Sequence, residues 1–144
     1  MQRLAQITTG AFDPARLNVQ SICPVIFFAH GLDCPHCRAA IQGFAGIKDR
    51  LMECEAEVFA VVPQAGQEDL KAFEPVRVVV DPNGLVRKDF AGLLEFDTDG
   101  KLLLFILNQG GAPSAAWVGD EADDPSLHDY TLKRLDYISV QCPE

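Results

Sequence analysis

The amino-acid sequence predicts an α/β fold with a central mixed sheet, helices on both faces of the sheet, and a C-terminal hairpin followed by a helix. Two observations carry this prediction. Apolar segments of strand length alternate with segments of helical periodicity, and alternating strands and helices form a partly parallel sheet that the helices cover. Near the C-terminus, two strand-like segments are separated only by a short turn that contains glycine, which favours antiparallel pairing.

Five segments have the β-branched or aromatic composition of buried strands. They are residues 24–30, 57–62, 76–81, 102–107 and 115–118. Turn-forming residues occupy positions 81–84, 97–100 and 108–111. The turn at 108–111 joins the last two strands into the predicted hairpin.

Helical periodicity fills intervals between these strands. After Pro35, four apolar residues recur with the spacing of one helix face, and these are Ala40, Phe44, Ile47 and Leu51. Gly43 and Gly46 interrupt this helix, and we expect them to weaken or kink it. Residues 67–73 form a second, short helix in this interpretation.

A third helix closes the chain. Asp124 is suited to cap it, with Pro125 at the first helical position. The apolar stripe that follows consists of Leu127, Thr131, Leu135, Ile138 and Cys142. No repeat or low-complexity linker divides the sequence, so residues 1–144 are expected to form a single domain.

Composition and charge narrow the class of partner. The 144 residues carry a formal net charge of −9, which disfavours nucleic acid and anionic membranes because both are bound by clustered Lys and Arg. No apolar run approaches the roughly 20 residues of a membrane-spanning helix, and the N-terminus has no apolar signal core. We therefore expect a cytoplasmic protein that binds neither membrane nor nucleic acid.

Cysteine usage agrees with a reducing compartment. The chain has five cysteines, an odd number that cannot pair completely within one chain. In a reducing cytoplasm, a pair of cysteines separated by two residues is more often catalytic or metal-binding than structural. The sequence has one such pair, Cys34-Pro35-His36-Cys37.

The position of this motif indicates chemistry. It follows the predicted strand 24–30 and begins a helix, and ligands gather at the carboxyl ends of strands in open α/β sheets. Pro35 suits the first turn because its missing N–H costs nothing there. Cys34 would then lie at the helix N-terminus, where free N–H groups and the helix dipole favour a thiolate.

The residues around Cys34 complete the candidate site. Cys37, three residues on, lies on the same face of the first turn and can form a disulfide with Cys34. His36 can add positive charge near the Cys34 sulfur at lower pH. A carboxylate at Asp33 acts in the opposite direction if it points at the thiolate. We therefore predict Cys34, Pro35, His36 and Cys37 as the catalytic residues.

The remaining cysteines are expected outside the site. Cys23 precedes the strand that leads to Cys34, roughly 20 Å away at the strand rise, and Cys54 follows the far end of the helix, about 25 Å away. Both are predicted as small buried hydrophobes. Cys142 lies on the terminal stripe, with core or exposed-end placement both open.

Two other interpretations of the cysteine pair stay open. A structural zinc site needs four ligands, and the sequence offers one cysteine pair with His30 and His36 nearby, which favours at most a weak adventitious site. The pair could also be two inert cysteines. A redox pair is the preferred interpretation, and we expect no metal and no cofactor.

The chain resembles the thioredoxin-fold redoxins. "PVIFFAHGLDCPHCRAAI" is similar to the thioredoxin active-site strand and helix, "KLLLFILNQGGAPSAAWVG" to the C-terminal hairpin, and "DYTLKRLDYI" to the last helix. The segment "AEVFAVVPQAGQEDLKAFEPVRVVVDPNGLVRKDFAG" resembles the alkyl hydroperoxide reductase/thiol-specific antioxidant group. The resemblance implies dithiol/disulfide chemistry, with Cys34 as nucleophile, Cys37 as resolving thiol, and Pro35-His36 as the dipeptide of strongly oxidising members.

Two departures from the thioredoxin pattern bear on the chemistry. Thioredoxins carry a buried acid six residues before the first cysteine, where this chain has Phe28. The proton acceptor for the second thiol is then missing unless Asp33 or His30 replaces it. The cis-proline that precedes the first hairpin strand is replaced by Gly100 or Lys101, which alters the surface that receives a protein substrate.

A third departure concerns peroxide chemistry. Peroxiredoxins place their reactive cysteine in a Pro-x-x-x-Thr-x-x-Cys loop. Counting back from Cys34 puts Gly31 at the threonine position and Phe27 at the proline position, so the orienting hydroxyl is missing. Counting back from Cys37 gives no better fit. Arg77 and Arg87 are the candidates for a peroxide-site arginine, although exposed charges are the simpler interpretation of both.

The sequence therefore predicts a thiol-disulfide oxidoreductase that uses the Cys34–Cys37 pair. The alternatives are a peroxiredoxin-like thiol peroxidase and a non-catalytic, metal-binding or simple binding module with the same fold. The expected partners are a protein or small-molecule thiol or disulfide and an electron donor. The sequence leaves the oligomeric state open.

Overall fold

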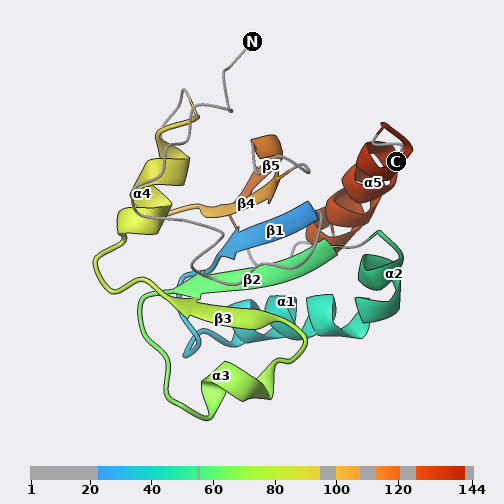
Figure 1. The fold of residues 1–144 in the computed structure, drawn as a ribbon. Coiled ribbons are helices and arrows are strands. Elements are labelled where there is room, and N and C mark those ends of the chain that lie inside the picture. Colours follow the sequence, from blue (N-terminus) through green and yellow to red (C-terminus); the bar gives the residue numbers. More distant parts are fainter. Residues whose placement is uncertain (1–22, 55, 95–99, 108–112, 121–125, 142–144) are drawn as a thin grey trace.

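The computed structural model describes residues 23–54, 56–94, 100–107, 113–120 and 126–141. These residues form a five-stranded mixed sheet with helices on both of its faces (Figure 1). The strands are β1 Cys23–Phe28, β2 Ala56–Val62, β3 Arg77–Val80, β4 Leu102–Leu107 and β5 Pro113–Gly119. All five predicted strands are present, each within a few residues of its expected bounds.

The strand order is β3-β2-β1-β4-β5. β1 pairs with β2, and β2 with β3, in parallel, whereas β4 is antiparallel to both β1 and β5. The predicted mixed sheet is thus confirmed, and its last two strands, β4 and β5, pair antiparallel. The predicted turns at 97–100 and 108–111 lie outside the described residues, except for Gly100 at the end of the first turn.

The helices are α1 Pro35–Gly46, α2 Lys48–Glu53, α3 Asp69–Ala72, α4 Leu85–Ala91 and α5 Ser126–Gln141. The predicted weakening of the helix after Pro35 is confirmed at Gly46, where α1 ends, and the segment continues as a separate helix, α2, from Lys48. Ile47 between them leaves the helical conformation, with φ −108° and ψ 26°. The break keeps Phe44 and Leu51 buried on the same side of the sheet.

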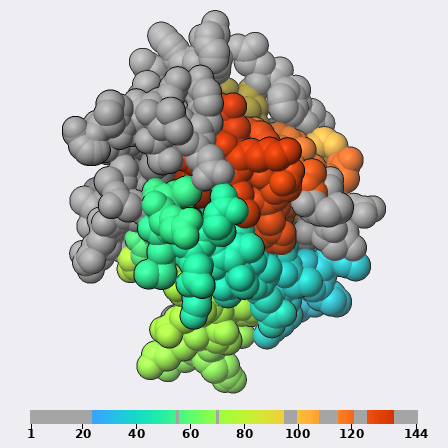
Figure 2. All heavy atoms as spheres, turned by 90° about the vertical axis from the view of Figure 1, so that its right-hand side faces the viewer, coloured from blue at the N-terminus to red at the C-terminus, as the bar shows by residue number. Residues whose placement is uncertain are grey.

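Gly43 has a different role from the predicted kink. A Cβ at this position would lie 2.7 Å from the His128 ring of α5. The ring packs edge-on against Phe44, and its Nε2–H donates to the Ala40 carbonyl at 2.8 Å. Glycine therefore permits the close approach of α5 to α1, and the two helices lie side by side on one face of the molecule (Figure 2).

Helix α4 was not predicted. The turn at 81–84 leads into it, with Gly84 in the left-handed region at φ 68°. The buried Asp81 carboxylate accepts hydrogen bonds from the Val86 and Arg87 amides at 3.3 and 3.2 Å, which satisfies free N–H groups of the first turn. The helix has only two buried apolar residues, Val86 and Phe90, so its periodic signal is short.

The sheet separates two apolar cores. The first core, here called the α1-side core, contains Cys37, Phe44, Leu51 and Leu135 together with inward residues of the strands. The second, the α4-side core, is built on Phe28, Phe90 and Phe105. Strand pleating sends alternate residues to opposite faces, so helices on both faces cover the sheet as predicted.

The terminal helix follows its predicted stripe where the structure describes it. Leu127, Thr131 and Leu135 are all fully buried, and the Thr131 hydroxyl donates to the Leu127 carbonyl. The predicted cap at Asp124 and Pro125 and the end of the stripe at Ile138 and Cys142 lie outside the described side chains. Among the described helices, none combines the length and the apolarity needed to cross a membrane.

Candidate functional site

Cys34 lies where the chain turns from β1 into α1. It is the N-cap residue of α1, with extended backbone angles of φ −89° and ψ 117°, and Pro35 follows in the first turn. Its N–H donates to the Gly31 carbonyl, and its carbonyl accepts from the Arg38 N–H at 3.0 Å. The side chain is half-buried. The predicted placement at a helix N-terminus beyond the end of a strand is confirmed.

Cys37 is held one turn into the same helix and is fully buried. The His30 N–H donates to its sulfur at 3.4 Å. This contact comes from the loop that joins β1 to α1, so the backbone before the motif fixes the second cysteine. The two thiols therefore differ in access to solvent, although they are only three residues apart.

Local hydrogen bonding lowers the pKa of the Cys34 thiol below its ordinary value. The largest cause is the backbone N–H of Cys37, although Cys34 forms no full capping hydrogen bond. The Cys37 thiol and the His36 backbone N–H also lower the pKa, whereas partial burial and the Asp33 carboxylate raise it. Free N–H groups of a first helical turn favour an anion in this way.

Burial raises the pKa of Cys37. Loss of solvent around the sulfur is the largest cause, and backbone N–H groups of His30 and Gly31 offset part of it. The hydrogen bond that Cys37 shares with Cys34 also raises the pKa of Cys37, since the Cys37 thiol keeps its proton to donate. One thiol of the pair is thus suited to be a thiolate and the other a neutral thiol.

The two residues inside the motif are exposed. Pro35 starts α1, as expected. His36 lowers the pKa of Cys34 through its backbone N–H. Outside the motif, Cys54 is buried in the α1-side core, which confirms its prediction. The side chains of Cys23 and Cys142 lie outside the described part of the structure.

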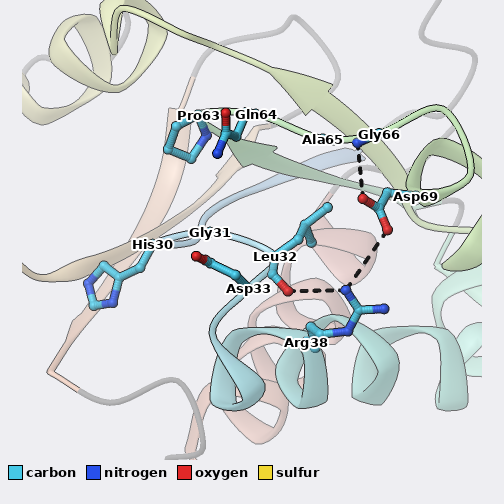
Figure 3. Close-up of a pocket in the computed structure, with 10 residues that line it drawn as sticks. All are labelled: His30, Gly31, Leu32, Asp33, Arg38, Pro63, Gln64, Ala65, Gly66 and Asp69. Carbon is cyan, nitrogen blue, oxygen red and sulfur yellow. Dashed lines mark hydrogen bonds and ion pairs between the residues drawn. The ribbon is translucent and has the colours of Figure 1, made fainter.

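A pocket of about 590 Å³ lies beside the motif, between the loops that follow β1 and β2 (Figure 3). It was not predicted. Its lining is His30, Gly31, Leu32, Asp33, Arg38, Pro63, Gln64, Ala65, Gly66 and Asp69. The sequence signal for it was weak, because residues from two loops meet there only after β1 and β2 pair in parallel.

Among the described residues, Arg38 is the one arginine that lines this pocket. Its Nη1 donates to the Leu32 carbonyl at 3.1 Å and lies 3.9 Å from Asp69 Oδ1. Its guanidinium also lies over the Phe73 ring. Asp69 in turn accepts a hydrogen bond from the Gly66 N–H at 3.0 Å. A cation is therefore fixed one helical turn from Cys34.

Gly31 occupies the position at which the peroxiredoxin pattern has threonine. A Cβ there would lie only 2.9 Å from Asp33 Oδ1. The space that a threonine side chain would need is next to the Asp33 carboxylate. This chain therefore lacks the threonine hydroxyl at position 31, and the Asp33 carboxylate lies beside the Gly31 backbone instead.

Two further positions correspond to the buried acid and the cis-proline of thioredoxins. Phe28, at the position of the thioredoxin acid, belongs to the α4-side core, whereas Cys37 belongs to the α1-side core. An acid at position 28 would therefore not adjoin Cys37 in this chain. Gly100, one of the two candidates for the cis-proline position, accepts a hydrogen bond from His30 Nε2 at 3.1 Å, so this part of the chain does reach the β1–α1 loop.

The two arginines considered for peroxide binding lie elsewhere. Arg77 pairs with Glu57 at 3.1 Å and stacks over Phe59. Arg87 donates to the Lys101 carbonyl at 2.9 Å. Neither lines the pocket beside the motif. Across the described residues, no group of three or more His, Cys, Asp and Glu side chains is arranged to hold a metal ion.

Known protein structures share this fold. Peroxiredoxin Q of Xanthomonas campestris matches with a TM-score of 0.65 at 18% identity, over 83% of this chain and 80% of that one. Peroxidoxin BcpB of Mycobacterium tuberculosis gives a TM-score of 0.68 at 16% identity, over 86% and 84%. The reduced 2-Cys peroxiredoxin of Plasmodium vivax gives 0.68 at 14%, over 84% and 70%.

The chain has the thioredoxin-like fold of the peroxiredoxins. This confirms, for the fold, the resemblance to redoxins of the alkyl hydroperoxide reductase/thiol-specific antioxidant group. The sequence matches no protein-family model and no characterised protein closely enough to assign it. At these identities the shared architecture does not carry activity from one protein to another, so function has to be argued from the Cys34 site.

Proposed function

We propose that this protein is a thiol-disulfide oxidoreductase that works through the Cys34–Cys37 dithiol. One observation carries the proposal, namely the opposite character of two adjacent thiols. Cys34 is half-buried at a helix N-terminus with a lowered pKa, and Cys37 is fully buried with a raised pKa. The thiolate is the reactive form in disulfide exchange, so the arrangement favours Cys34 as the attacking residue.

The reaction uses both cysteines in turn. The Cys34 thiolate attacks one sulfur of a substrate disulfide, which breaks the substrate S–S bond and releases one substrate thiol. Cys37 then loses its proton to the second departing substrate sulfur and attacks Cys34. The products are an internal Cys34–Cys37 disulfide and two substrate thiols. A thiol electron donor returns the pair to the dithiol.

The first test is a redox titration of the pair. Purified protein is equilibrated across glutathione and dithiothreitol series, alkylated, and weighed by mass spectrometry. We expect a reversible two-electron transition between roughly −120 and −270 mV, the range of working dithiol oxidoreductases. Two thiols that never oxidise across the series would contradict the proposal and favour a binding module.

Thiol peroxidase activity is the second candidate, and the fold shared with peroxiredoxins favours it. In that reaction Cys34 attacks a peroxide oxygen to give a sulfenic acid and an alcohol or water. Cys37 then displaces water to give the same internal disulfide. The test is peroxide consumption with dithiothreitol as reductant. Turnover no faster than in the Cys34→Ser variant would exclude this activity.

We also propose the cytoplasm as the working compartment. A reducing environment keeps the buried Cys37 and Cys54 as thiols and supplies the electrons that the cycle needs. The mass of the alkylated protein taken directly from cells, compared before and after reduction, measures the cysteine state in place.

A further inference from the structure

The pocket beside Cys34 carries charges of both signs. Arg38 supplies a guanidinium, and Asp33 and Asp69 supply carboxylates (Figure 3). Its volume of about 590 Å³ lies within the roughly 300–1,000 Å³ range of small-molecule sites. The pocket borders the motif, because its lining residue Asp33 directly precedes Cys34 and the Asp33 carboxylate acts electrostatically on the Cys34 thiol.

The Arg38 guanidinium is held in place but keeps N–H donors available to a ligand. Its side chain is 41% exposed, and its separation of 3.9 Å from Asp69 makes a loose ion pair. The Leu32 carbonyl and the Phe73 ring hold the guanidinium in place. A guanidinium has five N–H donors in a planar fork that matches a carboxylate, so Arg38 can receive a carboxylate from the pocket side.

The two acids limit what else can bind. A ligand with only negative charge would meet Arg38 but would be repelled by Asp33 and Asp69. A ligand with only positive charge would meet the acids but would be repelled by Arg38. Inside one small pocket, contacts between like charges are unfavourable and contacts between opposite charges are favourable. A group with an ammonium and a carboxylate on neighbouring atoms satisfies both signs.

We propose that the pocket binds the zwitterionic amino-acid end of a small disulfide substrate, with its carboxylate on Arg38 and its ammonium on Asp33 or Asp69. This inference rests on the proposed oxidoreductase function and names its substrate class. Exchange follows the balanced scheme above: the dithiol and one small disulfide give the internal disulfide and two amino-acid thiols. The pocket raises the rate by holding the substrate sulfur near Cys34.

The experiment compares four disulfides of different charge. They are cystine (zwitterionic), cystamine (ammonium only), dithiodiglycolate (carboxylate only) and 2-hydroxyethyl disulfide (neutral). Reduced protein is mixed with each, quenched by alkylation, and the rate constant for forming the internal disulfide is measured. Each rate is divided by the rate of the same disulfide with 2-mercaptoethanol, which removes intrinsic reactivity. We expect the normalised rate constant for cystine to exceed those of the other three disulfides by about tenfold. A preference of this size is what one bidentate contact between Arg38 and the cystine carboxylate can supply.

Two arginine variants decide whether the pocket is the cause. Arg38→Gln is expected to lower the normalised cystine rate about tenfold more than it lowers the neutral disulfide rate. Arg87→Gln is the matched control, because Arg87 also donates to a backbone carbonyl but lies outside the pocket. It should leave the cystine preference unchanged. The apparent pKa of Cys34 is measured in both variants, so that a change in thiolate content is recognised.

The outcomes separate this inference from the proposed function. Equal normalised rates for the four disulfides, with the internal disulfide still formed, would overturn the pocket assignment and leave the oxidoreductase intact. An Arg38→Gln effect of the same size on cystine and on the neutral disulfide would also overturn it. Failure of every disulfide to oxidise the pair would remove both proposals.

Discussion

The two faces of the sheet are covered by different helices and bury different side chains. Neighbouring residues of β1 illustrate this, because Phe27 points into the α1-side core and Phe28 into the α4-side core. The α4-side core is apolar throughout its buried residues, with Phe28, Phe90 and Phe105 in mutual ring contact. The α1-side core contains the thiol of Cys37. Both faces bury apolar side chains, but the thiol chemistry is confined to one of them.

The division follows from how each helix begins. The helix α1 starts immediately beyond β1, so its free N–H groups and Cys34 meet at the carboxyl end of a central strand. The helix α4 starts beyond the edge strand β3, and the Asp81 carboxylate already occupies its first-turn amides. One helix N-terminus is available to a thiolate, whereas the other is capped by the protein itself.

The largest effect that tests this division is expected from Cys37→Ala. Without the resolving thiol, Cys34 should still attack a disulfide, but the reaction should stop at the mixed disulfide and turnover should cease. Mass spectrometry of reduced protein mixed with 2-hydroxyethyl disulfide measures the adduct. The control on the opposite face is Phe28→Leu, which should form the internal disulfide normally. Full turnover by Cys37→Ala would show that another thiol resolves Cys34.

A large loss of stability is expected from Phe90→Ala. The ring is fully buried between Phe28 and Phe105, and truncating a buried phenylalanine costs about 3–5 kcal/mol. Urea unfolding measures the free energy of unfolding, and the pH dependence of alkylation measures the Cys34 pKa. We expect the stability to fall and the pKa to stay the same. A shifted pKa in the folded variant would show that the two faces are coupled.

A moderate effect is expected from Asp81→Ala. The change removes the acceptor for two first-turn amides of α4, and loss of such a cap costs about 0.5–2 kcal/mol. Thermal unfolding gives the stability change, and amide hydrogen exchange locates it. Asp81→Asn keeps an acceptor oxygen and should lose less. Faster exchange in α1 instead of α4 would contradict this assignment.

The smallest effect is expected from Asp33→Asn. The Asp33 carboxylate raises the pKa of Cys34, so removing its charge should move that pKa further down. Alkylation of Cys34 would then begin at lower pH than in the unaltered protein, and Cys37 would still react only at higher pH because burial raises its pKa. The control is Asp49→Asn in α2. An upward shift in Asp33→Asn would contradict the stated sign.

The strands and the site were largely predictable from sequence. Buried strands are short apolar runs bounded by turns, and the cysteine pair with proline between strand and helix has few other interpretations. The helix α4 was missed because two apolar residues are too few to establish a period. The weakness at Gly46 was anticipated, but its outcome as two separate helices was not, since Ala40, Phe44, Ile47 and Leu51 keep helical spacing across the break.

The sequence by itself determined the local features: strand identity, the α1 N-terminus, and the placement of Cys34 there. These depend on neighbours along the chain, which a sequence displays directly. Only the tertiary structure decided that Phe28 faces away from Cys37, that Gly43 makes room for His128, and that Arg38 and Asp69 share a pocket. Those relations depend on strand pairing and helix approach, which bring together residues far apart in the chain.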